Sequence, residues 1–112
     1  MEVYVIPEQA KDFREPYIEL GLVEEELYNY DRAIELFEKA ASIKEKNLRV
    51  VGEVFAWNET VYKELAICYK NKGNFKKAYD NILLAEEINK DSPSIQKLKS
   101  DIVGILKINK EL

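Results

Sequence analysis

The sequence predicts an all-α protein, built as a stack of antiparallel helix hairpins with about five helices. The first observation is an internal repeat, because a shift of 45 residues superimposes residues 28–43 on residues 73–88. The matching pairs are Asn29 with Asn74, Tyr30 with Phe75, Ala33 with Ala78, Phe37 with Ile82, Ala40 with Ala85, and Ile43 with Ile88. The second observation is composition: 34% charged and 46% hydrophobic residues with only three prolines suit a mostly helical chain. Internal repetition of this kind indicates stacked supersecondary units.

Each copy of the repeat is predicted to be a pair of helices, because the match extends upstream. Tyr17, Leu20 and Gly21 superimpose on Tyr62, Leu65 and Ala66. Asn29 and Asn74 stand where the second helix of each pair begins, and asparagine is a preferred N-cap because its side chain accepts a backbone N–H. These second helices are expected over residues 30–46 and 75–89, with apolar residues at the three-and-four spacing of a buried stripe.

A final helix is predicted from Pro93 to about Lys110. Ser92 is its expected N-cap, and proline fits the first helical position. Its apolar face consists of Ile95, Leu98, Ile102, Ile105 and Leu106, and the opposite face of Lys97, Ser100, Asp101, Gly104 and Lys107. A helix with one polar face can end a stack of repeats, so we interpret it as a capping helix.

The first helix of each pair is predicted to be extended. Residues 48–58 number eleven, which is close to three helical turns, so they keep a helix in phase. We therefore expect one helix over residues 48–71, and another from Pro7 to about Leu27 in which Pro16 either introduces a kink or starts the helix afresh. The expected organisation is a single domain over residues 1–112: an N-terminal arm and helix extension (1–13), repeat one (14–47), repeat two (48–92) and the capping helix (93–112).

These motifs resemble the tetratricopeptide repeat (TPR). The first copy reads Tyr17-x-x-Leu20-Gly21 and Ala33-x-x-x-Phe37; the second reads Tyr62-x-x-Leu65-Ala66-x-x-Tyr69, then Gly73 and Ala78-x-x-x-Ile82. In the first copy, Glu24 replaces an aromatic residue and Tyr28 replaces the turn glycine. The period of 45 residues also exceeds the roughly 34 of the family. The resemblance implies a right-handed α-solenoid that acts as a scaffold and binds a peptide or a partner helix in a concave groove.

The resemblance also implies which residues line that groove. They are Ile18, Leu22, Glu25 and Glu26 in the first copy, and Lys63, Ile67, Lys70 and Asn71 in the second. One branch of the family clamps a C-terminal carboxylate with lysines and asparagines. Glu15 and Glu19 stand in that region here, so we do not expect this activity.

Several other classes of function are disfavoured by the sequence. A net charge of −4 is unfavourable for nucleic-acid binding, and no apolar run is long enough to span a membrane. Without histidine, and with four widely separated glycines, the usual catalytic triads, most zinc sites and phosphate-binding loops are not expected. Glu24, Glu25 and Glu26 point in different directions on a helix, and Cys68 is expected to be a buried, inert thiol. We therefore predict a cytoplasmic, non-catalytic protein without cofactor or metal.

Self-assembly is the alternative to partner binding. Residues 1–59 carry a net charge of −7 and residues 60–112 a net charge of +3, which could steer a partner or favour head-to-tail association. Apolar residues in the extension, Val50, Val51, Val54 and Trp57, could also bind another copy. The expected partner is thus a protein or peptide, with a homo-oligomer as the other possibility.

Overall fold

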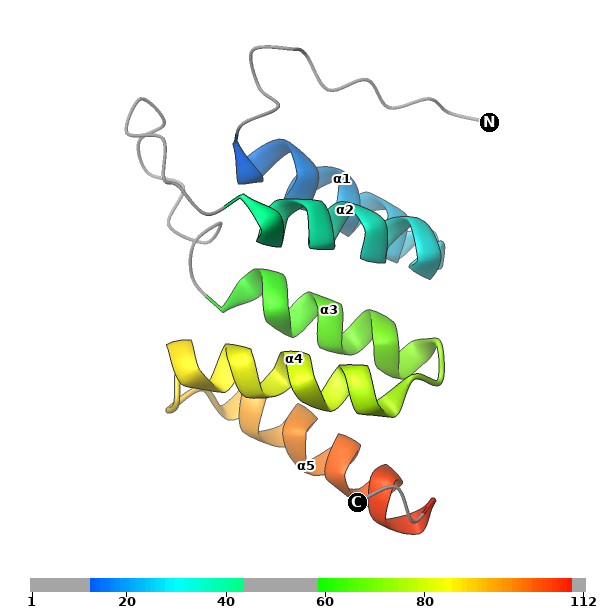
Figure 1. The fold of residues 1–112 in the computed structure, drawn as a ribbon, viewed down its shortest axis with the longest axis vertical. Helices are drawn as coiled ribbons and strands as arrows, with labels where there is room; N and C mark the ends of the chain where they lie inside the picture. Colours follow the sequence, from blue (N-terminus) through cyan, green and yellow to red (C-terminus); the bar gives the residue numbers. More distant parts are fainter. Residues whose placement is uncertain (1–12, 44–58, 110–112) are drawn as a thin grey trace.

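The structure, a computed structural model, describes residues 13–43 and 59–109. Within these ranges it contains no strand and five helices, which confirms the predicted all-α class. The helices are α1 (Arg14–Glu26), α2 (Tyr30–Ser42), α3 (Thr60–Asn71), α4 (Phe75–Ile88) and α5 (Pro93–Ile108). Figure 1 shows them as a stack with the antiparallel pair α1/α2 at one end, the antiparallel pair α3/α4 in the middle and α5 at the other end.

The two hairpins turn in the same way. Tyr28 and Gly73, at equivalent positions of the repeat, both have a positive φ, of 63° and 86°. In the first turn, the N–H groups of Tyr28 and Asn29 donate to the carbonyls of Glu25 and Glu24, at 3.0 and 2.9 Å. The second turn has the same pair of bonds, in which Gly73 donates to Lys70 and Asn74 to Tyr69. Both turns are therefore Schellman motifs, so the repeat seen in the sequence extends to the backbone.

The three predicted N-cap residues directly precede their helices, as expected, but only two of them accept a backbone hydrogen bond with their side chains. Asn74 accepts the N–H of Lys77 at 3.2 Å, and Ser92 accepts that of Ile95 at 3.4 Å, with Pro93 at the start of α5 as expected. Asn29 precedes α2 without accepting a cap bond from its side chain. Its amide instead donates to the carboxylate of Glu24.

A continuous core runs through the stack. Its fully or almost fully buried members are Tyr17, Ile18, Ala33, Leu36, Phe37, Ala40, Val61, Leu65, Ala66, Cys68, Tyr69, Ala78, Ile82, Ala85, Ile95, Ile102 and Leu106. The alanines at positions 33 and 40 and their equivalents at 78 and 85 are all fully buried, so the two copies share this part of the core. On α5, the buried residues fall on the predicted apolar face, while Lys97, Ser100, Asp101 and Lys107 are exposed.

The predicted extensions of the first helices are wrong where the structure tests them. Phe13 has an extended backbone and α1 begins at Arg14, which makes Pro16 the third residue of the helix. Proline is compatible with that position because the first four N–H groups of a helix have no partner within it. Pro16 therefore marks a fresh start, the second of the two alternatives.

The other helix boundaries differ from the prediction in a similar way. α3 begins at Thr60 after a turn at Glu59, so no unbroken helix runs over residues 48–71. Periodicity shows which face a segment would bury if it were helical, but it does not require the helix to be continuous. α2 ends at Ser42 rather than residue 46, because Ile43 is extended. The predicted helical segments at 7–12, 44–46 and 48–58 lie outside the described residues.

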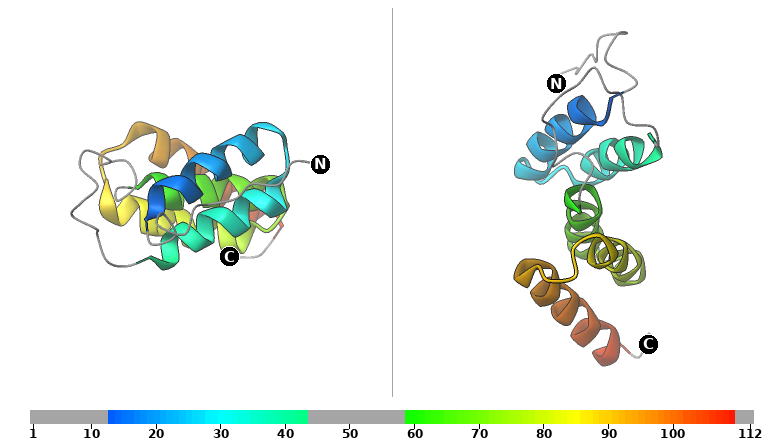
Figure 2. Two further views of the ribbon diagram at one scale, coloured as in Figure 1. Left: turned by 90° about the horizontal axis from the view of Figure 1, so that it is seen from above. Right: turned by 90° about the vertical axis from the view of Figure 1, so that its left-hand side faces the viewer.

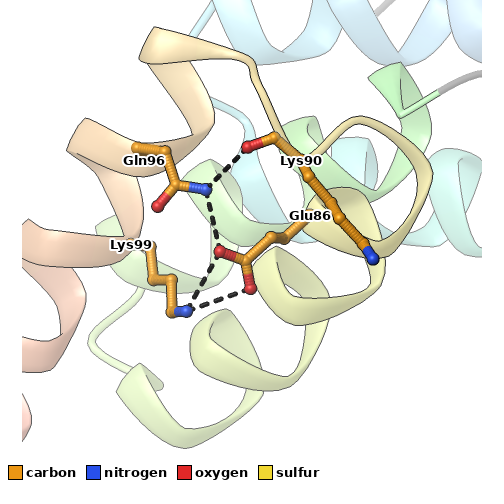
Figure 3. Close-up of polar contacts among 4 residues, drawn as sticks. All are labelled: Glu86, Lys90, Gln96 and Lys99. Carbon is orange, nitrogen blue, oxygen red and sulfur yellow. Dashed lines mark hydrogen bonds and ion pairs between the residues drawn. The ribbon is translucent and has the colours of Figure 1, made fainter.

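Polar contacts join α4 to the capping helix. The carboxylate of Glu86 on α4 accepts hydrogen bonds from Gln96 Nε2 at 2.8 Å and from Lys99 Nζ at 3.0 Å (Figure 3). Gln96 also donates to the carbonyl of Lys90 at 3.1 Å. These bonds from Gln96 and Lys99 hold the pKa of Glu86 below its usual value. The contacts fix α5 across the loop that connects it to α4.

Candidate partner-binding surface

The predicted groove residues come from α1 and α3, which belong to different hairpins. The right-hand view of Figure 2 places α2 and α4 on one side of the stack and α1 and the start of α5 on the other, with α3 between them. On each helix the predicted residues are three or four positions apart, so they share a face. We call the following set the α1–α3 face: Leu22, Glu25, Glu26, Lys63, Ile67, Lys70 and Asn71.

Exposure differs among the members of the α1–α3 face. Glu26 and Asn71, near the ends of their helices, are exposed, and the other members are half-buried. Leu22 packs partly against the core. The half-buried members leave part of their side chains accessible, as a binding surface requires.

Ile18 does not belong to this surface. Its side chain is 0% exposed and lies in the core with Tyr17 and Phe37. The prediction that Ile18 lines the groove is therefore wrong. The repeat motif assigns positions to a face of the helix, but it does not show how closely the second hairpin covers that face.

A pair of carboxyl groups lies between the two helices. Glu25 of α1 hydrogen-bonds with Glu64 of α3, and both side chains are half-buried. Burial raises the pKa of Glu25 to about 8, assisted by the hydrogen bond and negative charge of Glu64 and by the charge of Glu26, while Lys63 acts in the opposite direction. Because two carboxyl groups can hydrogen-bond only when one is protonated, Glu25 carries the shared proton at neutral pH.

The sequence analysis did not identify Glu64. The repeat aligns Glu25 with Lys70. Such an alignment identifies equivalent positions in the two hairpins, but it does not predict which residues of one hairpin contact the other. The packing of the first hairpin on the second brings Glu25 and Glu64 together. The sequence contains no signal that would have paired them.

Cys68 lies beside this carboxyl pair. Its side chain is fully buried, and burial, together with the charges of Glu25 and Glu64, raises the pKa of the thiol to about 12. At neutral pH the thiol is therefore protonated, and a protonated thiol is a poor nucleophile. This agrees with the prediction of a buried, inert cysteine.

Glu24 has a structural role. It is buried at the position equivalent to Tyr69, and its carboxylate accepts a hydrogen bond from Asn29 Nδ2 at 2.9 Å and lies 3.8 Å from Arg32 Nε. Asn29 and Arg32 thus offset the cost of burying the Glu24 carboxylate. The second copy has the ring of Tyr69 at this position. Tyr69 itself donates its hydroxyl hydrogen to Glu38 of α2 and so links the two hairpins.

The described part of the chain offers no site of another kind. Residues 13–43 and 59–109 contain no group of three or more Cys, Asp or Glu side chains that could hold a metal ion. Within the same ranges, no helix is both long enough and apolar enough to cross a membrane. The residues of the predicted self-assembly surface, Val50, Val51, Val54 and Trp57, lie outside the described residues.

Comparison with protein-family models, curated proteins and solved structures gives no match for this chain. The resemblance to the tetratricopeptide repeat therefore depends on the motifs in the sequence.

Proposed function

We propose that this chain is a non-catalytic protein–protein interaction module, a short TPR-like α-solenoid that binds a peptide or a partner helix on its α1–α3 face. The observation that carries the proposal is the equivalence of the two hairpins. The same 45-residue shift that aligns the sequences also aligns two Schellman turns, at Tyr28 and Gly73, and two buried alanine pairs. Stacked hairpins of this kind commonly use one extended side for binding.

The chemistry of the α1–α3 face supports this proposal. Leu22 and Ile67 are half-buried aliphatic residues on a side of the stack that carries charged residues around them. On the α1 side the negative charge comes from Glu26, because Glu25 is protonated at neutral pH, while Lys63 and Lys70 lie on the α3 side. The partner that fits is an amphipathic segment with a basic end over α1 and an acidic end over α3.

Partner capture by two variants tests the proposal. Ile67→Glu places a charge at the centre of the α1–α3 face and, unlike Leu22, Ile67 is not packed against the core. Leu84→Glu makes the same kind of change at an exposed position of α4, a helix that does not contribute to the α1–α3 face. The wild-type chain and both variants would be used as baits in extracts of the native source.

We expect a partner of the α1–α3 face to be captured by the wild-type chain and by Leu84→Glu, but not by Ile67→Glu. Circular dichroism would confirm that all three baits are helical. Binding would then be measured by calorimetry with the purified partner. Equal capture by all three baits would place the binding surface elsewhere. Capture of the chain alone, with a concentration-dependent mass in sedimentation, would favour the alternative of self-assembly.

A further inference from the structure

A second apolar surface lies on the outer side of α1. Val23 is 42% exposed and Leu27, directly after the helix, is 58% exposed, and both continue a row that begins at the half-buried Leu20. These residues follow one another at spacings of three and four, which is the spacing of the seam between two packed helices. We call Leu20, Val23 and Leu27 the outer seam of α1.

Val23 and Leu27 of the outer seam face away from the rest of the stack, while Leu20 also packs partly against the core. Successive residues turn by about 100° around a helix, so Leu27 lies about 200° from Glu25. Glu25 points toward Glu64 of α3, and the outer seam is therefore on the opposite side of α1. Figures 1 and 2 show α1 at the end of the stack, with α3 on one side only. The apolar residues of this surface are thus distinct from those of the α1–α3 face, and Glu26 borders both surfaces.

Negative charge lies along one side of the outer seam, the side away from α2, whereas on the α2 side the exposed bases Arg32 and Lys39 reach residues of α1. α1 contains five acidic residues and one base, Arg14, which is buried with its Nε donating to the carbonyl of Ile43 at 2.9 Å. Glu19 and Glu26, on the side of the seam away from α2, are exposed. The exposed charges beside the seam on α1 are therefore acidic.

We propose that the outer seam of α1 is a docking surface for a partner helix that carries an apolar stripe with lysine or arginine along one flank. The spacing of Leu20, Val23 and Leu27 matches such a stripe, and the carboxylates of Glu19 and Glu26 complement a basic flank on the side away from α2. Antiparallel pairing with α1 of a second copy is disfavoured, because it would bring the acidic flanks of both copies together.

A designed peptide pair tests this proposal. The first peptide is a helix of about three heptads with leucine at the seam positions and lysine along one flank, and the second carries glutamate along the same flank. Each would be titrated into the isotopically labelled full chain at physiological ionic strength. The expected result is binding of the lysine peptide, with the largest NMR shifts at Leu20, Val23 and Leu27, and no saturable binding of the glutamate peptide.

Variants separate docking on the seam from simple charge attraction. Val23→Ser combined with Leu27→Ser should weaken binding by about tenfold or more, because two apolar side chains lose their contact with the peptide. Leu84→Ser, at a similarly exposed position of α4, should leave the affinity unchanged. If the double variant fails to fold, the NMR shifts in the wild-type chain decide the question.

Four results would overturn the proposal. Equal binding of both peptides would show that charge does not select the partner. Unchanged affinity of the double variant would show that the peptide does not bind the seam. Self-association of the free chain that is lost in the double variant would make a second copy the occupant. Protection of Val23 and Leu27 from a soluble paramagnetic agent in the free monomer would mean that another part of the chain covers them. None of these outcomes depends on Ile67, so the proposed function of the α1–α3 face is tested separately.

Discussion

A β-carbon added to Gly21 would lie 2.7 Å from Cε1 of Phe37, inside van der Waals contact. The equivalent pair in the second hairpin is Ala66 and Ile82, and all four residues are buried. The first hairpin thus combines glycine with a large ring, whereas the second combines alanine with a smaller aliphatic side chain. The two copies fill the same helix contact in complementary ways, because closely packed interiors tolerate little change in volume.

Gly21→Ala is expected to destabilise the protein. Alanine is favoured over glycine within a helix by about 1 kcal/mol, but overpacking a filled core costs about 1–3 kcal/mol. Because the Phe37 ring is fully buried and cannot move into solvent, we expect a net loss of up to about 2 kcal/mol in urea denaturation. Adding Phe37→Ile should recover part of that loss, since it reproduces the pair found in the second hairpin. A more stable Gly21→Ala protein would show that the contact is loose.

Gly73→Ala and Gly104→Ala should have opposite effects on stability. No atom lies within 4 Å of a β-carbon added to either glycine, so only the backbone conformation distinguishes them. Gly73 has a φ of 86°, where an L-residue is strained by about 1–2 kcal/mol, whereas Gly104 lies inside α5, where alanine gains up to about 1 kcal/mol. Urea denaturation of both variants checks this. A change of the same sign in both would contradict the assigned turn geometry.

Tyr28→Gly is expected to stabilise the first turn. Tyr28 has a φ of 63° and is 77% exposed, so replacing it relieves backbone strain while removing little buried surface. Its edge-on ring contact with Tyr30, at 6.3 Å between centroids, offsets part of the gain. We expect a net increase of up to about 1 kcal/mol in the free energy of unfolding. A decrease would mean that the contact with Tyr30 outweighs the strain.

The sequence was sufficient to predict the helices and their buried stripes, because these depend on local periodicity and on residues such as Asn74 and Ser92 that cap in place. The equivalence of Tyr28 with Gly73 also followed from the repeat alone. Three features could not be predicted. The burial of Ile18 and the pairing of Glu25 with Glu64 depend on how one hairpin packs on the next, which periodicity does not determine.

Helix boundaries were the third feature. Pro16 allowed two interpretations, and only the structure shows that it belongs to the first turn of α1. The eleven-residue length of the segment 48–58 predicts which side its residues would face if it continued α3. It does not require the helix to be unbroken, so it is compatible with the turn at Glu59. Predictions from a repeat are therefore strongest within a hairpin and weakest where an insertion lengthens it.

Ala78→Leu should be much more destabilising than Lys77→Leu. Ala78 is fully buried at the close approach of α4 to the core, and enlarging it should cost about 1–3 kcal/mol. Lys77 is exposed, with its Nζ 5.4 Å from the centre of the Tyr69 ring, so its replacement loses at most a weak cation–π contact. Thermal and urea denaturation of both variants give the comparison. Similar losses in the two would show that α4 is rotated from the orientation described.

The carboxyl pair between α1 and α3 makes stability depend on pH. The pKa of Glu25 is about 8 in the folded chain, against an ordinary value of 4.5. Between these two pH values the folded state holds a proton that the unfolded state has released. The stability provided by this proton is fully present below about pH 4.5 and is lost as pH rises toward 8. The lowered pKa of Glu86 has the opposite effect, since the stability it provides is lost as pH falls.

Glu25→Gln isolates this contribution, because the amide has the shape of a protonated carboxyl group and can donate to Glu64 without titrating. Melting temperatures measured from pH 5 to pH 9 should fall less steeply with pH in this variant than in wild type. At the upper end of that range, the variant should be the more stable protein, since wild-type Glu25 must then either ionise beside Glu64 or retain a costly proton. Glu19→Gln makes the same chemical change on the exposed side of α1 and should reproduce the wild-type slope. Parallel curves for wild type and Glu25→Gln would show that α1 and α3 do not hold these carboxyl groups together.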